Sequence, residues 1–268
     1  MNIIFDMKLI NRNRIRSFRQ KCFSSYFILD RVAKEISFRL NMIDRRFENA
    51  LELHGITGIV GDTCTKQNKI NRMIRAEIST EFSSLKDEFI SCPLEEISSI
   101  SQSFDLILSP LSLHLINDIL GMIVKINHIL KPGGVFLAAI PGTGTLLELR
   151  RALLKAETKL TGGASPRIIP FIDIKSTGTL IQKAGFISPI IDQETYTVYY
   201  KSMFNLMHDL RKMGMSNPLI HRNKIPPHKS LFELASKIYE KENSDSTRNV
   251  TASFSIIYVI GWKPIGSK

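Results

Sequence analysis

The sequence lacks the features that mark several common classes of protein. It has only 3 cysteines, at Cys22, Cys64 and Cys92. This odd and widely spaced set predicts reduced thiols rather than a disulfide framework. No apolar run approaches the roughly 20 residues that a transmembrane helix needs. At the start, the apolar run 3–5 is followed at once by Asp6 and Lys8 and cannot form the core of a secretory signal. We therefore expect a cytoplasmic protein without a transmembrane segment.

Motifs for metal, hydrolytic and phosphoryl-transfer chemistry are also missing. The six histidines form neither an H-x-x-x-H motif nor a paired Cys/His array: His54, His114, His128, His208, His221 and His228. Such arrays are what a structural or catalytic zinc needs, so no metal is expected. The chain has no G-x-S-x-G elbow and no P-loop, which leaves hydrolase and kinase-like functions without support.

Positive charge is abundant, with 36 Lys and Arg against 25 Asp and Glu, a formal net charge of +11. The basic residues are spread out and do not alternate with aromatics, which argues against a nucleic-acid partner. The densest basic cluster, opposed only by Asp6, lies near the start: Lys8, Arg12, Arg14, Arg16, Arg19 and Lys21. Three interpretations stay open, namely a solvated helix face, an arm that docks an acidic protein partner, and an organellar transit segment.

The most informative stretch is 103–142, SFDLILSPLSLHLINDILGMIVKINHILKPGGVFLAAIPG. The apolar run 104–108 predicts a buried strand, and Ile116, Ile119, Ile123 and Leu130 recur at helical spacing. The Pro-Gly-Gly at 132–134 is expected to stop that helix, with a second buried strand over 135–140. Strand, helix and strand form one parallel βαβ unit, so the chain is α/β.

The segments FDLILS, LHLIND and LKPGGVFLAAIPG together resemble class I S-adenosylmethionine (SAM) dependent methyltransferases. Within them the chain is most similar to the group that contains BioC-type malonyl-carrier methyltransferases and the methyltransferase-like assembly factor of respiratory complex I. The resemblance implies a Rossmann-like, seven-stranded mixed sheet with strand order 3-2-1-4-5-7-6, flanking helices and a small helical cap. It covers nearly the whole chain, because PFIDIKSTGTLIQKAGF, MFNLMHDLRKMGM and IIYVIGWKP match the same group.

The cofactor loop departs from the family pattern Asp/Glu-x-Gly-x-Gly-x-Gly. Glu52 and Gly58 are in place, but His54 and Ile56 replace the first two glycines, and Gly55 falls at a position that the family leaves open. A β-branched residue strongly disfavours the positive φ that glycine provides. Either the loop shifts its register and uses Gly55, or the pocket is partly filled and SAM affinity is reduced or lost.

Four further site residues follow from the resemblance. Glu77, about 20 positions past Gly58, is expected to accept hydrogen bonds from a ribose. Ser109 is expected at the pocket mouth, and Arg31, on the first helix of the family, is the candidate contact for the cofactor carboxylate. His114 is a weak candidate for a general base, since its unperturbed pKa suits that role.

An apolar stripe predicts one helix over 17–43. In the family an acid that contacts the cofactor often follows the third strand directly, and here Cys92 takes its place.

Four domains are predicted: a basic arm with its helix (1–44), the methyltransferase-like core (45–200), a helical cap inserted between the last two strands (201–249), and a final core strand with its tail (250–268).

The leading functional hypothesis is a SAM-dependent methyltransferase-like enzyme of the complex I assembly factor type with a degenerate cofactor loop. In that branch the resemblance implies modification of a protein subunit, including hydroxylation of an arginine, and a mitochondrial matrix location in a eukaryote. One alternative is a non-catalytic scaffold that keeps the fold and binds a protein partner. The other is BioC-type esterification of an acyl carrier protein, in which a basic surface would meet an acidic carrier.

Overall fold

The computed structural model describes residues 3–83 and 88–266, and the chain divides into two compact units. We call the larger one the sheet unit; it comprises Tyr26–Pro141, Ile172–Glu194 and Ile257–Lys268. The smaller one, the cap unit, comprises Met1–Ser25, Gly142–Phe171 and Thr195–Ile256. The four-part division into domains concerns chain segments rather than compact units and stays a prediction.

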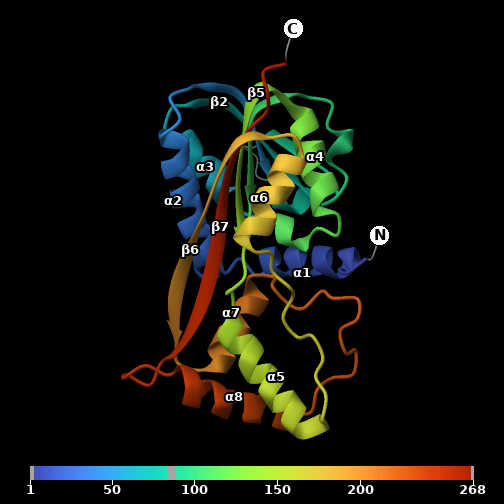
Figure 1. Ribbon diagram of the computed structural model, residues 1–268, viewed down its shortest axis with the longest axis vertical. Coiled ribbons are helices and arrows are strands. Elements are labelled where there is room, and N and C mark those ends of the chain that lie inside the picture. The colour runs from blue at the N-terminus through green and yellow to red at the C-terminus, as the bar shows by residue number, and fades with distance from the viewer. Residues whose placement is uncertain (1–2, 84–87, 267–268) are drawn as a thin grey trace. The chain divides into compact units, whose positions relative to one another are not determined.

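A seven-stranded sheet of order β3-β2-β1-β4-β5-β7-β6 organises the sheet unit (Figure 1). The strand bounds are β1 Phe47–Leu53, β2 Ile70–Glu77, β3 Glu88–Ser91, β4 Phe104–Pro110, β5 Leu130–Pro141, β6 Ile187–Tyr200 and β7 Val250–Trp262. The pairs β1–β2, β1–β4, β2–β3 and β4–β5 are parallel. The predicted fold class and strand order are therefore confirmed.

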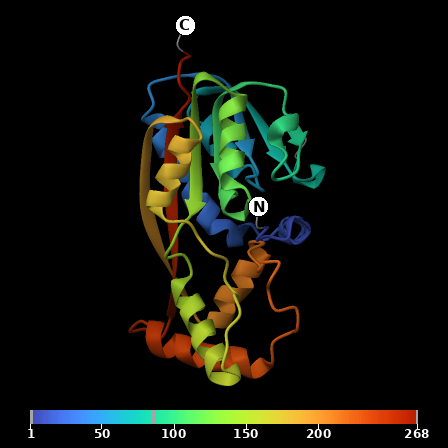
Figure 2. The same ribbon diagram turned by 45° about the vertical axis from the view of Figure 1, so that its right-hand side comes forward.

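Helices cover both faces of this sheet (Figures 1 and 2). Their bounds are α2 Phe27–Asn41, α3 Ile59–Thr65, α4 Ile119–Ile129 and α6 Ile174–Lys183. α2 packs against α3, and α4 packs against α6. β4 is buried along its whole length because both of its faces are covered, which explains its continuous apolar sequence.

Two sequence-based element predictions are corrected. The single helix predicted over 17–43 is interrupted, because Lys21 takes a left-handed conformation (φ 49°) after α1, Met7–Arg19, and α2 begins only at Phe27. The Pro-Gly-Gly segment does not stop a helix, since α4 already ends at Ile129 and these residues belong to β5. Gly133 N–H donates to Lys263 O (3.0 Å), and Lys263 N–H donates to Gly134 O (2.9 Å), so the segment pairs within the sheet.

The cap unit is mainly helical and contains α1, α5 Leu147–Thr161, α7 Met203–Lys212 and α8 Lys229–Asn243. α5 packs against α8, and Lys155 joins Glu242 across them at 2.7 Å. The basic N-terminal helix is part of this unit, because Ser17 Oγ donates to Lys212 O and Arg14 is only 3% exposed. Among the described residues, no helix is both long and apolar enough to span a membrane.

Candidate functional site

The candidate site lies in the sheet unit where β1, β2 and β4 end beside one another. β1 has β2 on one side and β4 on the other, so the order of the sheet reverses at this strand. In open α/β sheets such a switch point leaves a crevice at the carboxyl ends of the strands, where ligands bind. The loop 54–58, which connects β1 to α3, lies at this edge.

The loop follows the path that three glycines would take, although only the third is a glycine. His54, Ile56 and Gly58 have φ values of 55°, 64° and 76°. Gly55 is not among the residues with positive φ. The loop therefore has not shifted its register to use Gly55, and that alternative is wrong. A left-handed β-branched residue is a true outlier, and such strain persists only where surrounding contacts impose it.

Those contacts come from two buried acids. Glu77 Oε1 accepts a hydrogen bond from Ile56 N–H at 2.5 Å, and Glu77 Oε2 lies 4.0 Å from Nδ1 of His54. Glu52 Oε2 accepts from Gly61 N–H at 3.2 Å, at the start of α3. Glu52 and Glu77 are each 1% exposed. Glu77 thus holds the loop directly, and Glu52 holds the first turn of the helix that follows it.

Glycine at positions 55 and 58 lets the side chains of Glu52 and Arg75 lie close to the backbone of the loop. A Cβ at Gly55 would lie 2.0 Å from Oε1 of Glu52, and a Cβ at Gly58 would lie 2.6 Å from Cζ of Arg75. Both glycines were predicted as cofactor-binding residues. Their near contacts in this structure are side chains of the protein itself.

Arg75 is a site residue that the sequence analysis missed. It pairs with Glu52 in the β1–β2 register, and its Nε lies 3.9 Å from Oε2 of that acid. The guanidinium donates to Ile56 O and to Phe82 O, each at 3.2 Å. The sequence did hold a signal for Arg75: it is a charged residue within the otherwise apolar end of a strand. A buried cation needs polar partners, so nearby acids or carbonyl groups could have been expected.

Burial controls the ionisation of this cluster. Desolvation raises the pKa of Glu52 to about 8; Arg75 opposes the rise and the charge of Glu77 adds to it. Glu52 is therefore mostly a neutral acid at pH 7. Burial likewise raises the pKa of Cys92 to about 11, assisted by Glu77, and that of Cys64 to about 12, assisted by Glu52. These thiols are poor nucleophiles at neutral pH.

The other predicted residues lie at different places around this edge. Ser109, at the end of β4, is 3.0 Å from Ser112 Oγ, which donates to Leu53 O at 3.5 Å and so links β4 to the end of β1. His114 is buried in the short 3-10 helix Leu113–Leu115 that follows. Arg31 is exposed on α2, outside the buried cluster. The roles assigned to these residues stay predictions.

The described residues contain no group of three or more His, Cys, Asp or Glu side chains arranged to hold a metal ion. The arrangement instead offers a backbone loop, a buried acid at the end of each of two strands, and serine hydroxyls at the end of a third.

Comparisons with known proteins agree with this geometry. A methyltransferase domain family matches residues 57–138. The chain is 33% identical to the human protein named arginine-hydroxylase NDUFAF5, mitochondrial, over 97% of this chain and 77% of the relative. It is 31% identical to a malonyl-[acyl-carrier protein] O-methyltransferase of Xylella fastidiosa, over 60% of this chain and 52% of that relative.

Solved structures share the fold at low sequence identity. The YcgJ protein of Bacillus subtilis matches with a TM-score of 0.58 and 11% identity, over 86% of this chain and 98% of that one. A SAM-dependent methyltransferase of Thermotoga maritima matches with a TM-score of 0.51 and 15% identity, over 96% of this chain and 100% of that one. Identities this low show the fold and nothing further.

Proposed function

The chain belongs to the arginine-hydroxylase NDUFAF5 family of methyltransferase-fold proteins, and on that basis we propose that it is an enzyme that binds SAM and modifies a side chain of a protein. The observation that carries the proposal is the left-handed backbone at His54 and Ile56. Strain of this kind costs about 1–3 kcal/mol per residue and clusters at ligand sites. A loop that served only to connect β1 to α3 would gain stability by relaxing.

The residues present fit the cofactor in four respects. The loop 54–58 keeps the path over which a nucleoside part can pass, next to the switch point of the sheet. Glu77 is an acid at the end of the neighbouring strand, where it would accept from ribose hydroxyls. Ser109 would line the mouth of the pocket, and Arg31 would pair with the carboxylate of the methionine part. Cys92 offers a weaker acceptor than the acid of the family.

Bound SAM would supply an activated sulfonium carbon, so the protein would need few catalytic side chains. Its task would be to orient the substrate and to exclude water. His114 is buried close after the end of β4 and would act, if at all, as a general base.

A protein is the proposed substrate, and arginine the proposed target, because the relatives at about a third identity are named arginine-hydroxylases. A subunit of a respiratory complex is the partner that the assembly-factor resemblance suggests. The proposed location is the mitochondrial matrix in a eukaryote and the cytoplasm otherwise.

Thermal unfolding with S-adenosylhomocysteine tests cofactor binding. At about a hundredfold excess over Kd, a ligand that binds only the folded state adds about 2.7 kcal/mol, which raises the midpoint by roughly 5–11 °C for a protein of this size. The Glu77→Gln variant should lose this shift relative to its own ligand-free midpoint. Glu88→Gln on the neighbouring strand should keep it, because Glu88 is exposed and pairs with Arg72. No shift in the unaltered protein at millimolar ligand would refute the proposal.

Candidate protein substrates are incubated with the enzyme and SAM, with and without dioxygen and a two-electron reductant, because hydroxylation needs an oxidant and electrons that SAM does not supply. Mass spectrometry then distinguishes the two reactions. Addition of a methyl group and addition of an oxygen atom give different masses, and fragmentation locates the modified residue. Modification at a residue other than arginine would leave cofactor binding standing and reject the proposed target.

A non-catalytic scaffold is the rival that a specific observation favours. Ile56 has a side chain where the family has none, and Oε1 of Glu52 already occupies the space at Gly55. This rival predicts no thermal shift in the unaltered protein and a shift after glycine is restored at positions 54 and 56. The BioC-type alternative, supported by the likeness to a malonyl-carrier methyltransferase, predicts methyl transfer to a malonyl-carrier protein that weakens at high salt.

A further inference from the structure

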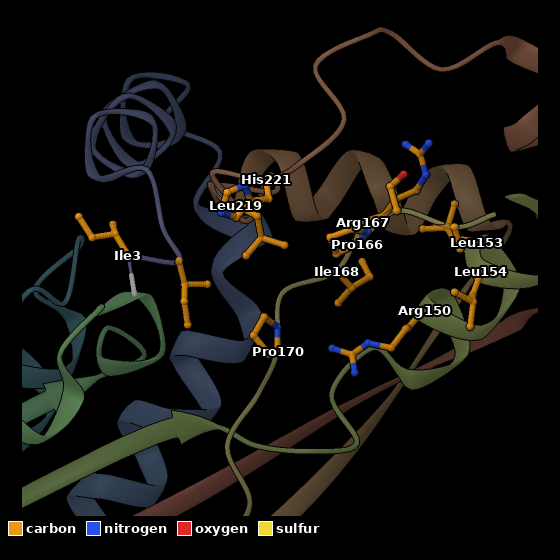
Figure 3. A pocket seen from close by; sticks show the side chains of 13 residues that line it. Ile3, Arg150, Leu153, Leu154, Pro166, Arg167, Ile168, Pro170, Leu219 and His221 are labelled. Atoms are coloured by element: carbon orange, nitrogen blue, oxygen red, sulfur yellow. The ribbon is translucent and has the colours of Figure 1, made fainter. Parts of the chain in front are cut away.

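A groove of about 950 Å³ lies within the cap unit (Figure 3). This is at the upper end of the range of about 300–1,000 Å³ found for ligand sites. Four segments line it: the start of the chain, α5, the loop 164–170 and the turn 219–221. Its wall is mostly apolar, with Leu153, Leu154 and Ile168 among the lining side chains, and Arg150 and His221 add polar groups.

Hydrogen bonds and one ion pair fix the walls. Glu157 on α5 accepts from Ser165 Oγ at 2.7 Å and from Arg167 Nη2 at 2.6 Å, which ties the loop 164–170 to the helix. Ile220 N–H donates to Ile4 O at 3.0 Å, and Asp6 N–H donates to Pro218 O at 2.9 Å. These bonds hold the start of the chain in place as one rim of the groove. The shape of the groove is therefore fixed by contacts within the protein.

Large apolar side chains remain exposed at this rim. Ile3 is 59% exposed, Ile4 41% and Leu154 51%. These residues lie on two of the lining segments, the start of the chain and α5, and exposed apolar side chains beside polar groups are typical of interaction sites. All of these residues belong to the cap unit.

The charge of the groove is positive. Arg167 is neutralised by Glu157, but Arg150 donates only to the carbonyl of Ile169, at 2.6 Å. Across the described part of the chain, no carboxylate lies within ion-pair distance of Arg150. The wider unit has the same sign: the segments of the cap unit contain 20 Lys and Arg against 8 Asp and Glu, whereas those of the sheet unit contain 16 against 17. The entire net positive charge of the protein therefore resides in the cap unit.

We propose that this groove binds an acidic, amphipathic segment of a partner protein. Apolar side chains of the segment would pack on Leu153, Leu154 and Ile168, and a carboxylate would pair with Arg150. A protein segment fits better than a small anion, because the positive charge extends over the whole unit and the apolar rim is too exposed to enclose a small ligand. The proposal goes beyond the proposed function and holds whether or not the cofactor site is filled.

Fluorescence anisotropy with a labelled helical peptide tests it. The peptide has about 14 residues, with leucines along one face and glutamates elsewhere. One matched peptide has lysine for every glutamate, and another has alanine for every leucine. We expect binding of the acidic leucine peptide alone, with affinity falling as salt rises from about 50 to about 500 mM.

Paired variants of the full chain locate the binding. Arg150→Glu should weaken it about tenfold, the effect of a close charge pair, whereas Lys237→Glu, an equal charge reversal at an exposed site on α8, should change it by less than about twofold. Leu154→Asn should weaken it about fivefold, and Leu160→Asn, 47% exposed on the same helix but outside the groove, should not. Circular dichroism confirms that each variant is folded.

Three results would overturn the proposal. One is no binding of the acidic peptide, and a second is equal loss from Arg150→Glu and Lys237→Glu, which would indicate diffuse charge attraction. The third is binding of dodecanoate, but not of the peptide, in a manner that Leu154→Asn abolishes; the groove would then be a site for a small amphiphile.

Discussion

The loop 54–58 and the strand β4 form adjoining sides of the candidate site and are built in opposite ways. β4 is mostly apolar and buried at all seven positions, and Ser109 near its end hydrogen-bonds to Ser112 in the segment that follows. The loop has two non-glycine residues at positive φ above two buried acids and a buried arginine. The strand is stabilised by burial of apolar surface, whereas the loop is held in an unfavourable conformation by buried polar contacts. Its conformation therefore depends on a few side chains and should be far easier to perturb.

The largest expected effect concerns the pH dependence that Glu52 creates. The pKa of Glu52 is raised to about 8 in the folded protein from the ordinary value of 4.5, so the folded state binds more protons than the unfolded state between these values. Stability is therefore highest below pH 4.5 as far as this group is concerned, and it falls as pH rises through 8, by on the order of 4 kcal/mol. Urea denaturation between pH 5 and pH 9 measures it.

The matched variants are Glu52→Gln, which should remove most of this slope, and Glu48→Gln on the same strand, which is exposed and should leave it unchanged. An unchanged slope in Glu52→Gln would mean that another group causes it, and the account of the loop as a strained structure over a neutral acid would be wrong.

The next effect is steric. Gly55→Ala places a Cβ against Oε1 of Glu52, whose carboxyl group is buried and accepts a hydrogen bond from Gly61 N–H. Overpacking of this kind costs about 1–3 kcal/mol in the free energy of unfolding. In the Glu52→Ala background the same substitution should cost much less, and a double-mutant cycle measures the difference. Gly163→Ala, where a Cβ meets nothing within 4 Å, is the control.

The third effect is relief of strain. Ile56→Gly removes a β-branched residue from φ 64°, which should regain about 1–3 kcal/mol of strain against roughly 1 kcal/mol of added backbone entropy. The variant should be equally stable or up to about 2 kcal/mol more stable, and should bind S-adenosylhomocysteine more tightly. Ile56→Ala removes the β-branch but keeps a Cβ at positive φ, so it should relieve only part of the strain and be less stable than Ile56→Gly. Equal stability of the two variants would show that Ile56 is not strained.

The contrast between loop and strand also explains how far the sequence could be interpreted. The strand order and the flanking helices follow from the resemblance, and the buried strands 104–108 and 135–140 follow from their apolar runs, because burial dictates those residues. The bounds around Lys21 and Pro132 were wrong, since a left-handed lysine and the pairing of Gly133 with Lys263 depend on contacts remote in sequence.

The conformation of the loop 54–58 could not be predicted from the sequence. Its departure from the glycine pattern was visible in the sequence, but the sequence offered no way to choose between a shifted register and retained strain. That choice depends on Glu77 bonding to Ile56 and on Arg75 reaching the same loop from β2. The assignments of Glu52, Gly55, Gly58, Glu77, Ser109, Arg31 and His114 to cofactor or catalytic roles await the experiments proposed above.

The smallest change in the free energy of unfolding is expected for substitutions at the end of β4. These test whether the strand depends less on single polar contacts than the loop does. Ser109→Ala removes one hydroxyl of the Ser109–Ser112 pair and should cost about 1 kcal/mol, the net value of a typical hydrogen bond. The double variant Ser109→Ala with Ser112→Ala should cost less than the sum of the two single variants, because each hydroxyl is the partner of the other. Ser91→Ala at an exposed position on β3 is the control, measured by the same urea denaturation. A loss from Ser109→Ala larger than that from Gly55→Ala would reverse the comparison, since the strand would then be the side that depends on a single polar contact.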